Sequence, residues 1–399
     1  MRKTLHLFLK ISLMIFLCVI LGSILLTLVY CIPIQKIQRN VNESMEIFEE
    51  EKTYPELSKW CTSTLDNYTD SIMLMSASYS GDEDPFNKAL MVYRLEQEDS
   101  LQVVNYPTYW HGYLIFLKPL LVFMDYGEIR VLNLVIQTLI NIAIIGLMFK
   151  KNLKQYILPY ILSVCMIMPI ATAFSMQFAD IFYIFSIANI VLLCSKEKWN
   201  NKDTYCMFFA AIGMATSYFD LLTYPLLTVG IPMILYMCTN DTENLRENLK
   251  DMFKYIFCWG FGYAGMWAGK WFLATLFTDV NVIGDAILSF LFRTSSETAM
   301  GKFSIIMVFA KNVYRFIKTP VTIIVGIFVL KRIFDIIKNR IRIDKSTLIQ
   351  FVVVCLLPFG WYIFASNHSY IHSFFTNKIM MIVVFAIMCF LTKTVSRKE

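Results

Sequence analysis

Charged residues are scarce in this chain, because only 17% of its 399 residues are Asp, Glu, Lys or Arg. A soluble protein of this length usually carries about a quarter charged residues. Apolar residues make up 57% of the chain and include 33 Phe and 22 Met. So much apolar surface needs lipid as its solvent, which excludes an ordinary soluble protein. The net charge of +6 does not indicate nucleic-acid binding, since the basic residues form short clusters between apolar runs.

The chain also lacks a disulfide framework. Most of its 10 cysteines fall in or beside apolar runs, where they act as small hydrophobic residues, and only Cys31 and Cys61 could face an oxidising compartment. Internal repeats, low-complexity tracts and a soluble domain are absent from the sequence as well. We therefore expect a single membrane domain over residues 1–399.

The amino terminus has the look of a signal peptide, with Arg2 and Lys3 before an apolar run from Ile11 to Cys31. That run is long enough to cross a bilayer, and no small-x-small cleavage site follows it, so we expect an uncleaved span. Hydropathy and length predict ten spans in all: 11–31, 129–149, 156–174, 177–194, 204–219, 221–238, 253–277, 320–337, 346–365 and 378–394.

Basic clusters between these spans alternate cleanly in a ten-span chain and hold more than half of its 36 Lys and Arg residues. By the positive-inside rule their side is cytoplasmic, which predicts a multi-pass protein of the cell membrane with both termini in the cytoplasm. The clusters are Arg2, Lys3 and Lys10; Lys150, Lys151 and Lys154; Lys196, Lys198 and Lys202; Arg246, Lys250 and Lys254; Lys331, Arg332, Lys338, Arg340, Arg342 and Lys345; and Lys393, Arg397 and Lys398.

Two loops face the other side, 32–128 and 278–319. The first is too polar to cross, and shorter helices are expected in it at 69–79, from Pro85 onwards, and at 113–124. The fold class is therefore all-α, with about ten transmembrane helices and an extracytoplasmic helical first loop. That loop should begin with a helix on the membrane surface or on the bundle, because apolar residues recur at three- and four-residue spacing: Ile34, Ile37, Val41, Met45 and Phe48.

Acidic residues of the first loop are candidates for chemistry. Asp66 and Asp70 flank 67–69 at the start of an expected helix. An ionised carboxylate there suits a general base that deprotonates a hydroxyl, and the alternative is helix capping. Asp82 and Asp84 suit a divalent cation such as Mg²⁺ or Mn²⁺, and the alternative is a solvated turn with Asp84 as a cap.

Histidines and basic residues gather near the outer boundary, where charge beside lipid is costly and indicates function. His111 follows an aromatic stretch, and His368 and His372 share a helical face at i, i+4 spacing. We expect them to hydrogen-bond a phosphate or sugar, since zinc would need a third ligand. Arg130 and Lys270 suit a phosphate clamp at the membrane edge, with snorkelling as the alternative.

The order of these features resembles the membrane-embedded GT-C glycosyltransferases that use polyprenyl-phosphate sugars, including proteins of bacterial surface-polysaccharide assembly. One amino-terminal span precedes a long acidic loop, an interfacial helix after His111-Gly112, and a span that begins at Gly127-Glu128-Ile129-Arg130. The likeness covers about residues 1–150. The family's short acidic signature could match either Asp66 and Asp70 or Asp82 and Asp84. The family's acid usually lies closer to the first span than these residues do, so the base is not assigned by position.

The resemblance implies transfer of a sugar from a polyprenyl phosphate to a cell-surface glycan or lipid acceptor on the outer face, among membrane lipids. An outer Asp would act as the base, and basic groups would stabilise the leaving phosphate. Some family members need a divalent cation.

Other functions stay open on the sequence alone. A polysaccharide polymerase would rely on outer arginines such as Arg94, Arg130, Arg293 and Arg315. A transporter or flippase of lipid-linked saccharides would carry midplane polar groups and repeated helices, which this chain lacks. A membrane acyltransferase would use a histidine, and a non-catalytic assembly subunit would keep the fold without the reaction.

Overall fold

The computed structural model describes residues 2–97, 101–195, 199, 201–240, 244–298 and 301–396, and helices dominate them. The all-α class is confirmed, apart from two antiparallel hairpins, β1–β2 and β3–β4. Lys196, Lys198, Arg397 and Lys398 of the basic clusters lie outside the described residues. The elements are α1 (Arg2–Tyr30), α2 (Ile34–Glu51), α3 (Asn67–Ser78), α4 (Pro85–Met91), β1 (Tyr93–Gln97), β2 (Leu101–Asn105), α5 (Leu114–Leu121), α6 (Tyr126–Lys150), η1 (Lys154–Tyr156), α7 (Ile157–Met166), α8 (Pro169–Phe174), α9 (Met176–Ser195), α10 (Lys202–Phe219), α11 (Leu227–Thr239), α12 (Leu245–Phe277), α13 (Val282–Thr294), β3 (Glu297–Thr298), β4 (Gly301–Lys302), α14 (Ile305–Ile317), α15 (Val321–Lys338), α16 (Lys345–Phe364), α17 (Ser366–Ile371), α18 (Ser373–Thr376), η3 (Asn377–Met380) and α19 (Met381–Ser396).

Long apolar helices mark the chain as a multi-pass membrane protein. Many of their large side chains are exposed, as in α1, where Leu13, Phe16 and Leu28 are each more than half exposed. Lipid is the solvent that fits such faces. The other predicted spans also contain helix, in α7–α8, α10, α11, α12 and α15. Among the described residues, five segments are long and apolar enough to cross a membrane: Thr4–Tyr30, Tyr126–Lys150, Met176–Ser195, Lys345–Phe364 and Ser373–Ser396.

Two predicted spans differ in outline from the structure. The stretch 156–174 is broken at Met168, which has a φ of 58°, and resumes at Pro169, because proline cannot donate inside a helix. The stretch 221–238 becomes helical only at Leu227, and α11 has 13 residues, fewer than the roughly 20 that a straight span needs. The residues before α11 form a turn that is important for the site described below.

The first loop contains strands as well as helices, so the expectation of helices alone is wrong there. Strands β1 and β2 pair antiparallel, with Tyr93 opposite Asn105. Apolar and polar residues alternate over most of β1, which is the strand signal, but β2 breaks the alternation at Val103 and Val104, and each strand has only 5 residues. Such a short alternation does not stand out beside the longer helical pattern.

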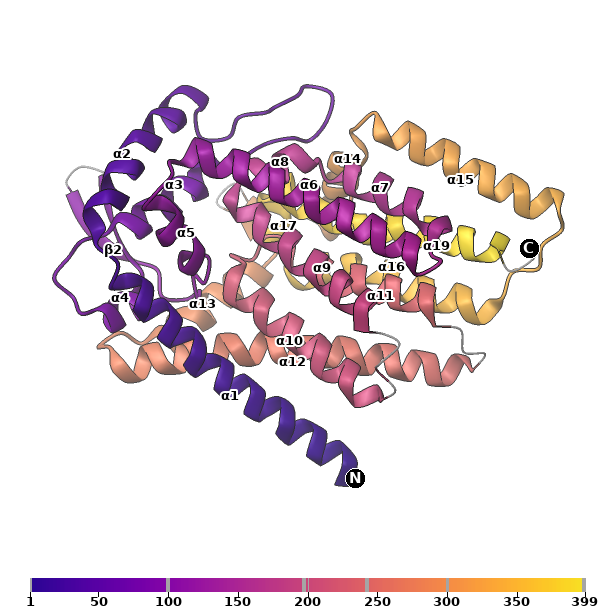
Figure 1. The fold of residues 1–399 in the computed structure, drawn as a ribbon, viewed down its shortest axis with the longest axis horizontal. Helices are drawn as coiled ribbons and strands as arrows, with labels where there is room; N and C mark the ends of the chain where they lie inside the picture. The colour runs from indigo at the N-terminus through magenta and orange to yellow at the C-terminus, as the bar shows by residue number, and fades with distance from the viewer. Residues whose placement is uncertain are drawn as a thin grey trace.

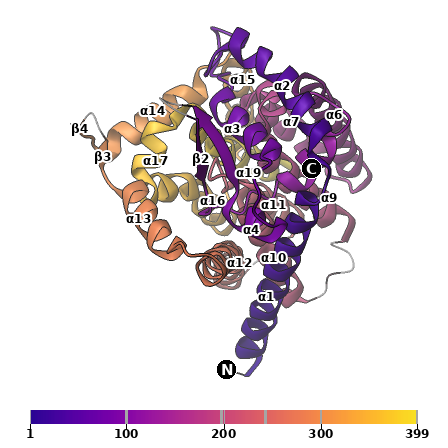
Figure 2. The same cartoon turned by 90° about the vertical axis from the view of Figure 1, so that its left-hand side faces the viewer.

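Helices α2 to α5 and the β1–β2 hairpin gather at one end of the helix bundle, and we call them the platform (Figure 1). The helix predicted from the spacing of Ile34 to Phe48 is present as α2, which buries Ile37 and Val41. Two side chains fasten it to its neighbours: Asn40 Nδ2 donates to the Leu121 carbonyl at 2.8 Å, and Ser44 Oγ accepts from the Tyr126 N–H at 2.9 Å. Figure 2 looks onto this end and shows α13, α14 and α17 beside the platform.

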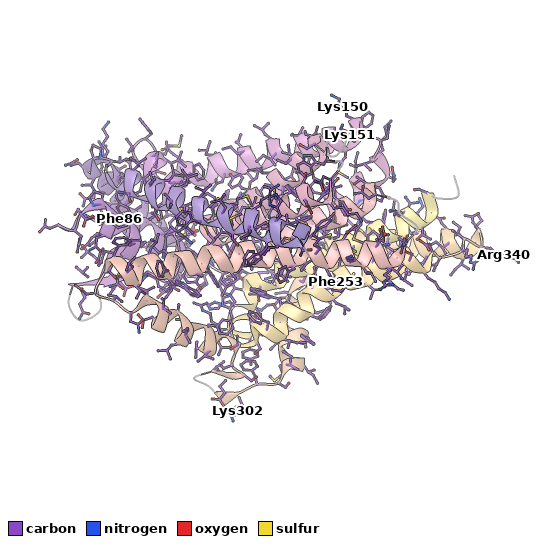
Figure 3. The ribbon with its side chains drawn as sticks, turned by 90° about the horizontal axis from the view of Figure 1, so that it is seen from below. Phe86, Lys150, Lys151, Phe253, Lys302 and Arg340 are labelled. Carbon is purple, nitrogen blue, oxygen red and sulfur yellow. The ribbon has the colours of Figure 1, made fainter. Side chains whose placement is uncertain are left out.

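Basic residues lie at the opposite end of the bundle. Figure 3 places Lys150, Lys151 and Arg340 far from Phe86, which belongs to α4 of the platform. We call this the basic end. The platform and these three basic residues therefore lie at opposite ends of the molecule, which is the separation that the charge pattern predicts.

Glycines allow α10 and α12 to approach very closely. A Cβ on Gly213 would lie 2.0 Å from the Trp259 carbonyl oxygen, and one on Gly262 would lie 2.2 Å from the Ala210 carbonyl oxygen. Small residues at such contacts let membrane helices pack backbone to backbone. This pair positions the α10–α11 turn that reaches the site.

We expect Gly262→Leu to push α10 and α12 apart and to lower the free energy of unfolding by about 1–3 kcal/mol, the usual cost of overpacking. Gly260→Leu in the same helix is the matched control, because a Cβ at Gly260 meets nothing within 4 Å. Thermal unfolding of the purified variants measures the difference. Equal stability of the two variants would contradict this packing.

Candidate functional site

A cavity of about 260 Å³ lies where the platform meets the helix bundle, and we call it the platform cavity. The predicted residues Asp66, His111, His368 and His372 lie on its wall, whereas Asp70, Arg130 and Lys270 do not. Its wall consists of Asp66, Tyr68, Thr69, Ile72, Arg94, Tyr106, Tyr109, His111, Tyr113, Gln177, Leu221, Arg293, His368, His372 and Phe375.

Asp66 supplies a carboxylate to the cavity wall and also begins α3. Its side chain accepts hydrogen bonds from the backbone N–H and the hydroxyl of Thr69, both at 3.0 Å. Burial raises the pKa of Asp66, while the bonds from Thr69 act in the opposite direction. Capping and cavity lining thus coexist in this residue, and its carboxylate is held in one orientation.

Asp70 is not part of the cavity wall and caps a different helix. Its carboxylate accepts from the backbone N–H groups of Met176 and Gln177, at 3.0 and 3.1 Å, and from the Tyr126 hydroxyl at 2.5 Å. These amides belong to the first turn of α9, where an anion is favoured. Burial nevertheless raises the pKa of Asp70 to about 7. Asp70 therefore joins the platform to α9.

Arg130 is fully used inside the protein. Its guanidinium donates to Glu51 at 2.8 and 2.9 Å, to Asn67 Oδ1 at 2.8 Å and to the Phe174 carbonyl at 2.9 Å. The opposing effects of burial and of these contacts leave the pKa of Glu51 lowered. Because each of its three guanidinium nitrogens has a partner, this arginine braces α2, α3 and α8, and it is not part of the cavity wall.

Lys270 also has hydrogen-bond partners for its ammonium group within the protein. Its ammonium donates to the carbonyls of Ala89 and Leu90, at 3.0 and 2.6 Å, and lies 5.5 Å from the Trp110 ring. These carbonyls end α4, and a cation at a helix carboxyl end satisfies them. Neither a phosphate clamp nor snorkelling describes this lysine, which fixes α4 to α12.

His111 keeps the cavity wall in shape. Its Nε2 lies 2.9 Å from the Tyr106 carbonyl, which can only accept, so Nε2 carries the proton and Nδ1 accepts from the Tyr113 hydroxyl at 2.9 Å. Burial lowers the pKa of His111 to about 3, so the ring is neutral. Both ring nitrogens are therefore occupied within the wall.

His368 and His372 lie side by side, with ring centroids 4.8 Å apart. His368 donates from Nε2 to the Leu222 carbonyl at 2.7 Å and faces Arg293 Nη1 with Nδ1 at 3.2 Å. The His372 ring stacks on Phe375 at 5.2 Å. Within the described part of the chain no group of three or more His, Cys, Asp or Glu could hold a metal ion, so the histidine pair has no third ligand there.

The turn before α11 brings the Leu222 carbonyl to His368. Asp220 accepts from the Thr223 N–H at 3.0 and 3.1 Å and from its hydroxyl at 2.5 Å. Leu222 between them has a φ of 65°, a strained value for a branched side chain. The strained turn therefore places the Leu222 carbonyl within hydrogen-bond distance of His368 Nε2.

Two arginines give the cavity a positive wall. Arg94 pairs with Glu96 through Nε and Nη2, but its buried Nη1 has no hydrogen-bond partner in the described structure. Arg293 lies 5.6 Å from the Tyr109 ring centroid, and its partners, including the Tyr106 hydroxyl at 3.4 Å, are neutral. Guanidinium N–H groups that lack a carboxylate partner can donate to the oxygens of a phosphate.

The sequence could suggest these arginines only for the alternative polymerase function, and it gave no sign of Gln177. Gln177 is buried, lines the cavity, and has an Oε1 without a hydrogen-bond partner among the described residues. An unused acceptor of this kind suits a hydroxyl-bearing ligand. No local pattern around Gln177 could have revealed it, because its position depends on the contact of α9 with α3.

Asp82 and Asp84 lie outside the platform cavity and are exposed. Asp84 Oδ1 accepts from the backbone N–H groups of Phe86 and Asn87, at 2.9 and 3.1 Å, so it caps α4 as the alternative interpretation expects. Among the described residues, no group of three or more His, Cys, Asp or Glu that could hold a metal ion includes this acidic pair.

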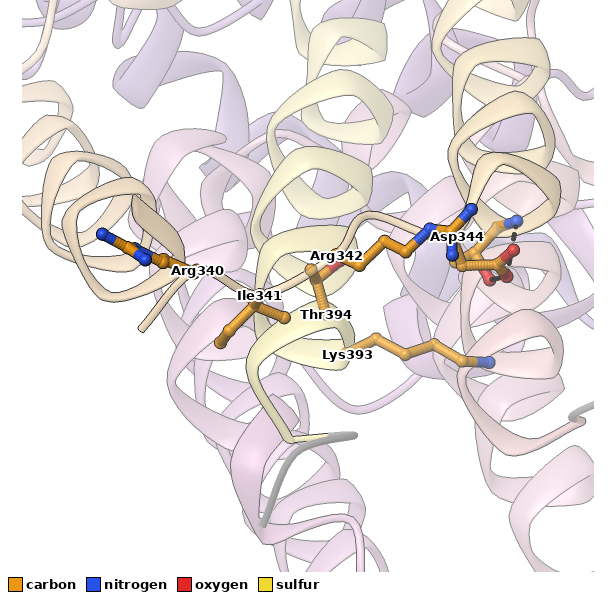
Figure 4. A pocket seen from close by; sticks show the side chains of 7 residues that line it. Arg340, Ile341, Arg342, Asp344, Lys393 and Thr394 are labelled. Carbon is orange, nitrogen blue, oxygen red and sulfur yellow. Dashed lines mark hydrogen bonds between the residues drawn. The ribbon is translucent and has the colours of Figure 1, made fainter. Parts of the chain in front are cut away.

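A second cavity, of about 310 Å³, lies at the basic end (Figure 4). It is larger, but its central charges belong to helix ends. Lys393 donates to the Met237 carbonyl at 2.7 Å, and Asp344 accepts from the Ser346 and Thr347 N–H groups. Arg340 points away from these groups in Figure 4. We therefore place the candidate chemistry in the platform cavity.

Comparisons with protein-family models, with curated proteins and with solved structures find no match to this chain. The side chains of the platform cavity and the membrane character of the chain are therefore the features that indicate a function.

Proposed function

We propose that the chain is a GT-C-type membrane glycosyltransferase that moves a sugar from a polyprenyl-phosphate donor to a cell-surface glycan or lipid acceptor. One observation carries the proposal: a single cavity combines a carboxylate, Asp66, with two arginines, Arg94 and Arg293. A phosphate leaving group needs the arginines, and an acceptor hydroxyl needs the carboxylate. The aromatic walls suit the sugar between them.

The proposal includes ten spans with both termini in the cytoplasm. Under the positive-inside rule the basic end lies in the cytoplasm and the platform lies outside the cell membrane. The position of Lys150, Lys151 and Arg340 opposite the platform supports this orientation (Figure 3). The platform cavity then meets the outer leaflet, where the phosphate of a lipid-linked sugar resides.

The reaction is a direct displacement. Arg293 and Arg94 bind the donor phosphate, and Asp66 takes the proton of the acceptor hydroxyl as its oxygen attacks the anomeric carbon. The new carbon–oxygen bond forms while the bond from that carbon to the phosphate oxygen breaks. The electron pair of the broken bond stays on the polyprenyl phosphate, whose added charge the arginines stabilise. Attack from the opposite face inverts the anomeric centre.

The expected divalent cation is a separate proposal, because Asp82 and Asp84 do not fit it. Asp84 is engaged as a helix cap and neither residue lines the cavity. No step above depends on a metal. Transfer measured with EDTA, and again after Mg²⁺ or Mn²⁺ is restored, shows whether a cation takes part in the reaction.

A polysaccharide polymerase is the second candidate, favoured by the same arginines. Of those expected for it, Arg94 and Arg293 line the cavity, whereas Arg130 is paired internally and Arg315 lies outside the cavity. A polymerase joins repeated units and yields a ladder of lengthening products, while a glycosyltransferase adds one sugar. Product length therefore separates the two.

The test is a transfer assay in membranes that contain the protein, with a labelled polyprenyl-phosphate sugar and an acceptor extract. We expect label to appear on the acceptor as a single added sugar. A ladder of products would favour the polymerase. Movement of the intact lipid-linked sugar across the membrane, without transfer, would show a transporter or flippase instead.

A further inference from the structure

Exposed tyrosines border the mouth of the platform cavity. Tyr54 is 49% exposed and Tyr68 is 52% exposed, and their ring centroids lie 6.4 Å apart. Tyr68 is itself part of the cavity wall. Tyr54 also contacts Phe374 at 5.4 Å, and Phe374 contacts the wall residue Phe375 at 4.8 Å. A row of rings thus runs from the cavity to the protein surface; we call Tyr54, Tyr68 and Phe374 the aromatic strip.

The strip is held in place by its own loop. Backbone hydrogen bonds close the loop between α2 and α3, from the Leu65 N–H to the Pro55 carbonyl at 2.9 Å and from the Tyr68 N–H to the Thr53 carbonyl at 3.2 Å. The Thr62 hydroxyl ties the same loop to the Arg315 carbonyl of α14 at 2.7 Å. Rigid, half-exposed rings of this kind present a ready binding face at low entropic cost.

The strip lies beside the carboxylate of the cavity. Burial and the negative charge of Asp66 raise the pKa of Tyr54 to about 12, so its hydroxyl stays neutral and can donate. The arginines are grouped elsewhere, around Tyr106 and Tyr109. A ligand on the strip therefore meets the proposed base first, and the phosphate-binding side separately.

We propose that the aromatic strip binds the acceptor as a saccharide, with sugar rings stacked on Tyr54 and Tyr68 and one hydroxyl presented to Asp66. The proposal rests on the glycosyltransferase function above. Sugars present faces of weakly positive C–H groups, which the negative face of an aromatic ring attracts, and tyrosine adds a hydroxyl for hydrogen bonding. An interfacial aromatic belt that contacts lipid headgroups is the competing explanation.

The experiment uses the full-length protein in nanodiscs and two probes: a short-chain polyprenyl-phosphate sugar, and oligosaccharides released from the cell envelope by mild acid. We expect Tyr54→Ala and Tyr68→Ala each to raise the KM for the oligosaccharide acceptor about three- to tenfold, with the KM for the donor at the wild-type value. Tyr54→Phe should retain most acceptor affinity, because it keeps the ring. Phe123→Ala is the control, since Phe123 is 79% exposed and lies away from the cavity.

Direct binding of the oligosaccharides, followed by saturation-transfer NMR, separates the two proposals. Binding that weakens in Tyr54→Ala but not in Phe123→Ala supports the strip, even if no donor is turned over and the glycosyltransferase proposal fails. Turnover of donor with the same acceptor affinity in wild type and both tyrosine variants overturns the strip. Equal losses in Phe123→Ala and Tyr54→Ala also overturn it, in favour of a general lipid contact.

Discussion

Replacing Asp66 with asparagine should remove most sugar transfer while the protein stays folded. Loss of a general base typically slows a reaction by about 10²–10⁴-fold. Asparagine caps helices about as well as aspartate, and its oxygen can still accept from the Thr69 N–H that begins α3. We therefore expect kcat to fall by that factor, with the KM for the donor and the melting temperature near the wild-type values. Steady-state kinetics and thermal unfolding of the same preparation measure both.

Asp70→Asn is the matched control, and it should show the opposite behaviour. The buried carboxylate accepts from the N–H groups of Met176 and Gln177, and an amide would turn a donor towards one of them. A buried donor without an acceptor costs about 1–3 kcal/mol. Stability should therefore fall, while transfer per folded molecule persists. Normal transfer in Asp66→Asn together with lost transfer in a stable Asp70→Asn would reverse the assignment of the base.

The two carboxylates also predict pH effects of opposite sign. A base acts only when deprotonated, and burial raises the pKa of Asp66, so transfer should increase as pH rises through a value above the ordinary range of aspartate. Asp70 has its folded pKa raised to about 7, so its stabilising contribution is full at low pH and is lost as pH rises through about 7. Activity profiles of wild type and Asp66→Asn, with unfolding curves of wild type and Asp70→Asn, separate the two.

The sequence predicts which stretches meet at the platform cavity better than which of their side chains face it. The sequence points to the short stretch from Asp66 to Asp70, where both acids suit either a base or a cap. Their difference depends on α9, more than a hundred residues later, whose first-turn amides take up Asp70 and leave Asp66 on the cavity wall. No periodicity within α3 carries that information.

The basic residues illustrate the same limit. For Arg130 and Lys270 the sequence offered a phosphate clamp or snorkelling, and the structure shows a third arrangement. Lys270 closes the end of α4, about 180 positions earlier in the chain, and Arg130 joins Glu51 and Asn67. The sequence indicates that a charged residue in an apolar run needs a partner if it is buried. It does not show which distant residue is that partner, because this depends on how the helices pack.

Irregular backbone was the other feature that the sequence concealed. Hydropathy alone treats 221–238 as one span, because the apolar run is continuous. In the structure the first residues of this stretch form the strained turn at Leu222 instead of helix. The Leu222 carbonyl in that turn accepts the hydrogen bond from His368. Non-helical backbone inside a membrane protein is tolerated where protein buries it or where it lines a cavity. The non-helical turn that hydropathy does not predict therefore lies at the candidate site.

Arg293→Ala should weaken donor binding more than any other single change in the cavity. Among the described residues Arg293 has only neutral partners, so its charge is available to a phosphate, whereas Glu96 already neutralises Arg94. A hydrogen bond to a charged group contributes about 1.5–3 kcal/mol, which corresponds to a rise of about 10- to 150-fold in the KM for the donor. Arg293→Lys should fall between, because lysine keeps the charge but loses the planar fork that grips two phosphate oxygens.

Arg315→Ala is the control for Arg293→Ala, since Arg315 lies on α14 of the same loop but outside the cavity. Equal donor KM in the two variants would remove Arg293 from phosphate binding. Measuring acceptor affinity distinguishes a loss of donor binding from a general loss of stability. Arg293→Ala should leave the affinity for oligosaccharide on the aromatic strip unchanged, whereas an unstable protein would lose both. If the donor KM rises, and rises less when salt is increased, the interaction is electrostatic as proposed. The arginine that the polymerase alternative would also require then acts on a lipid phosphate, and product length decides between the two functions.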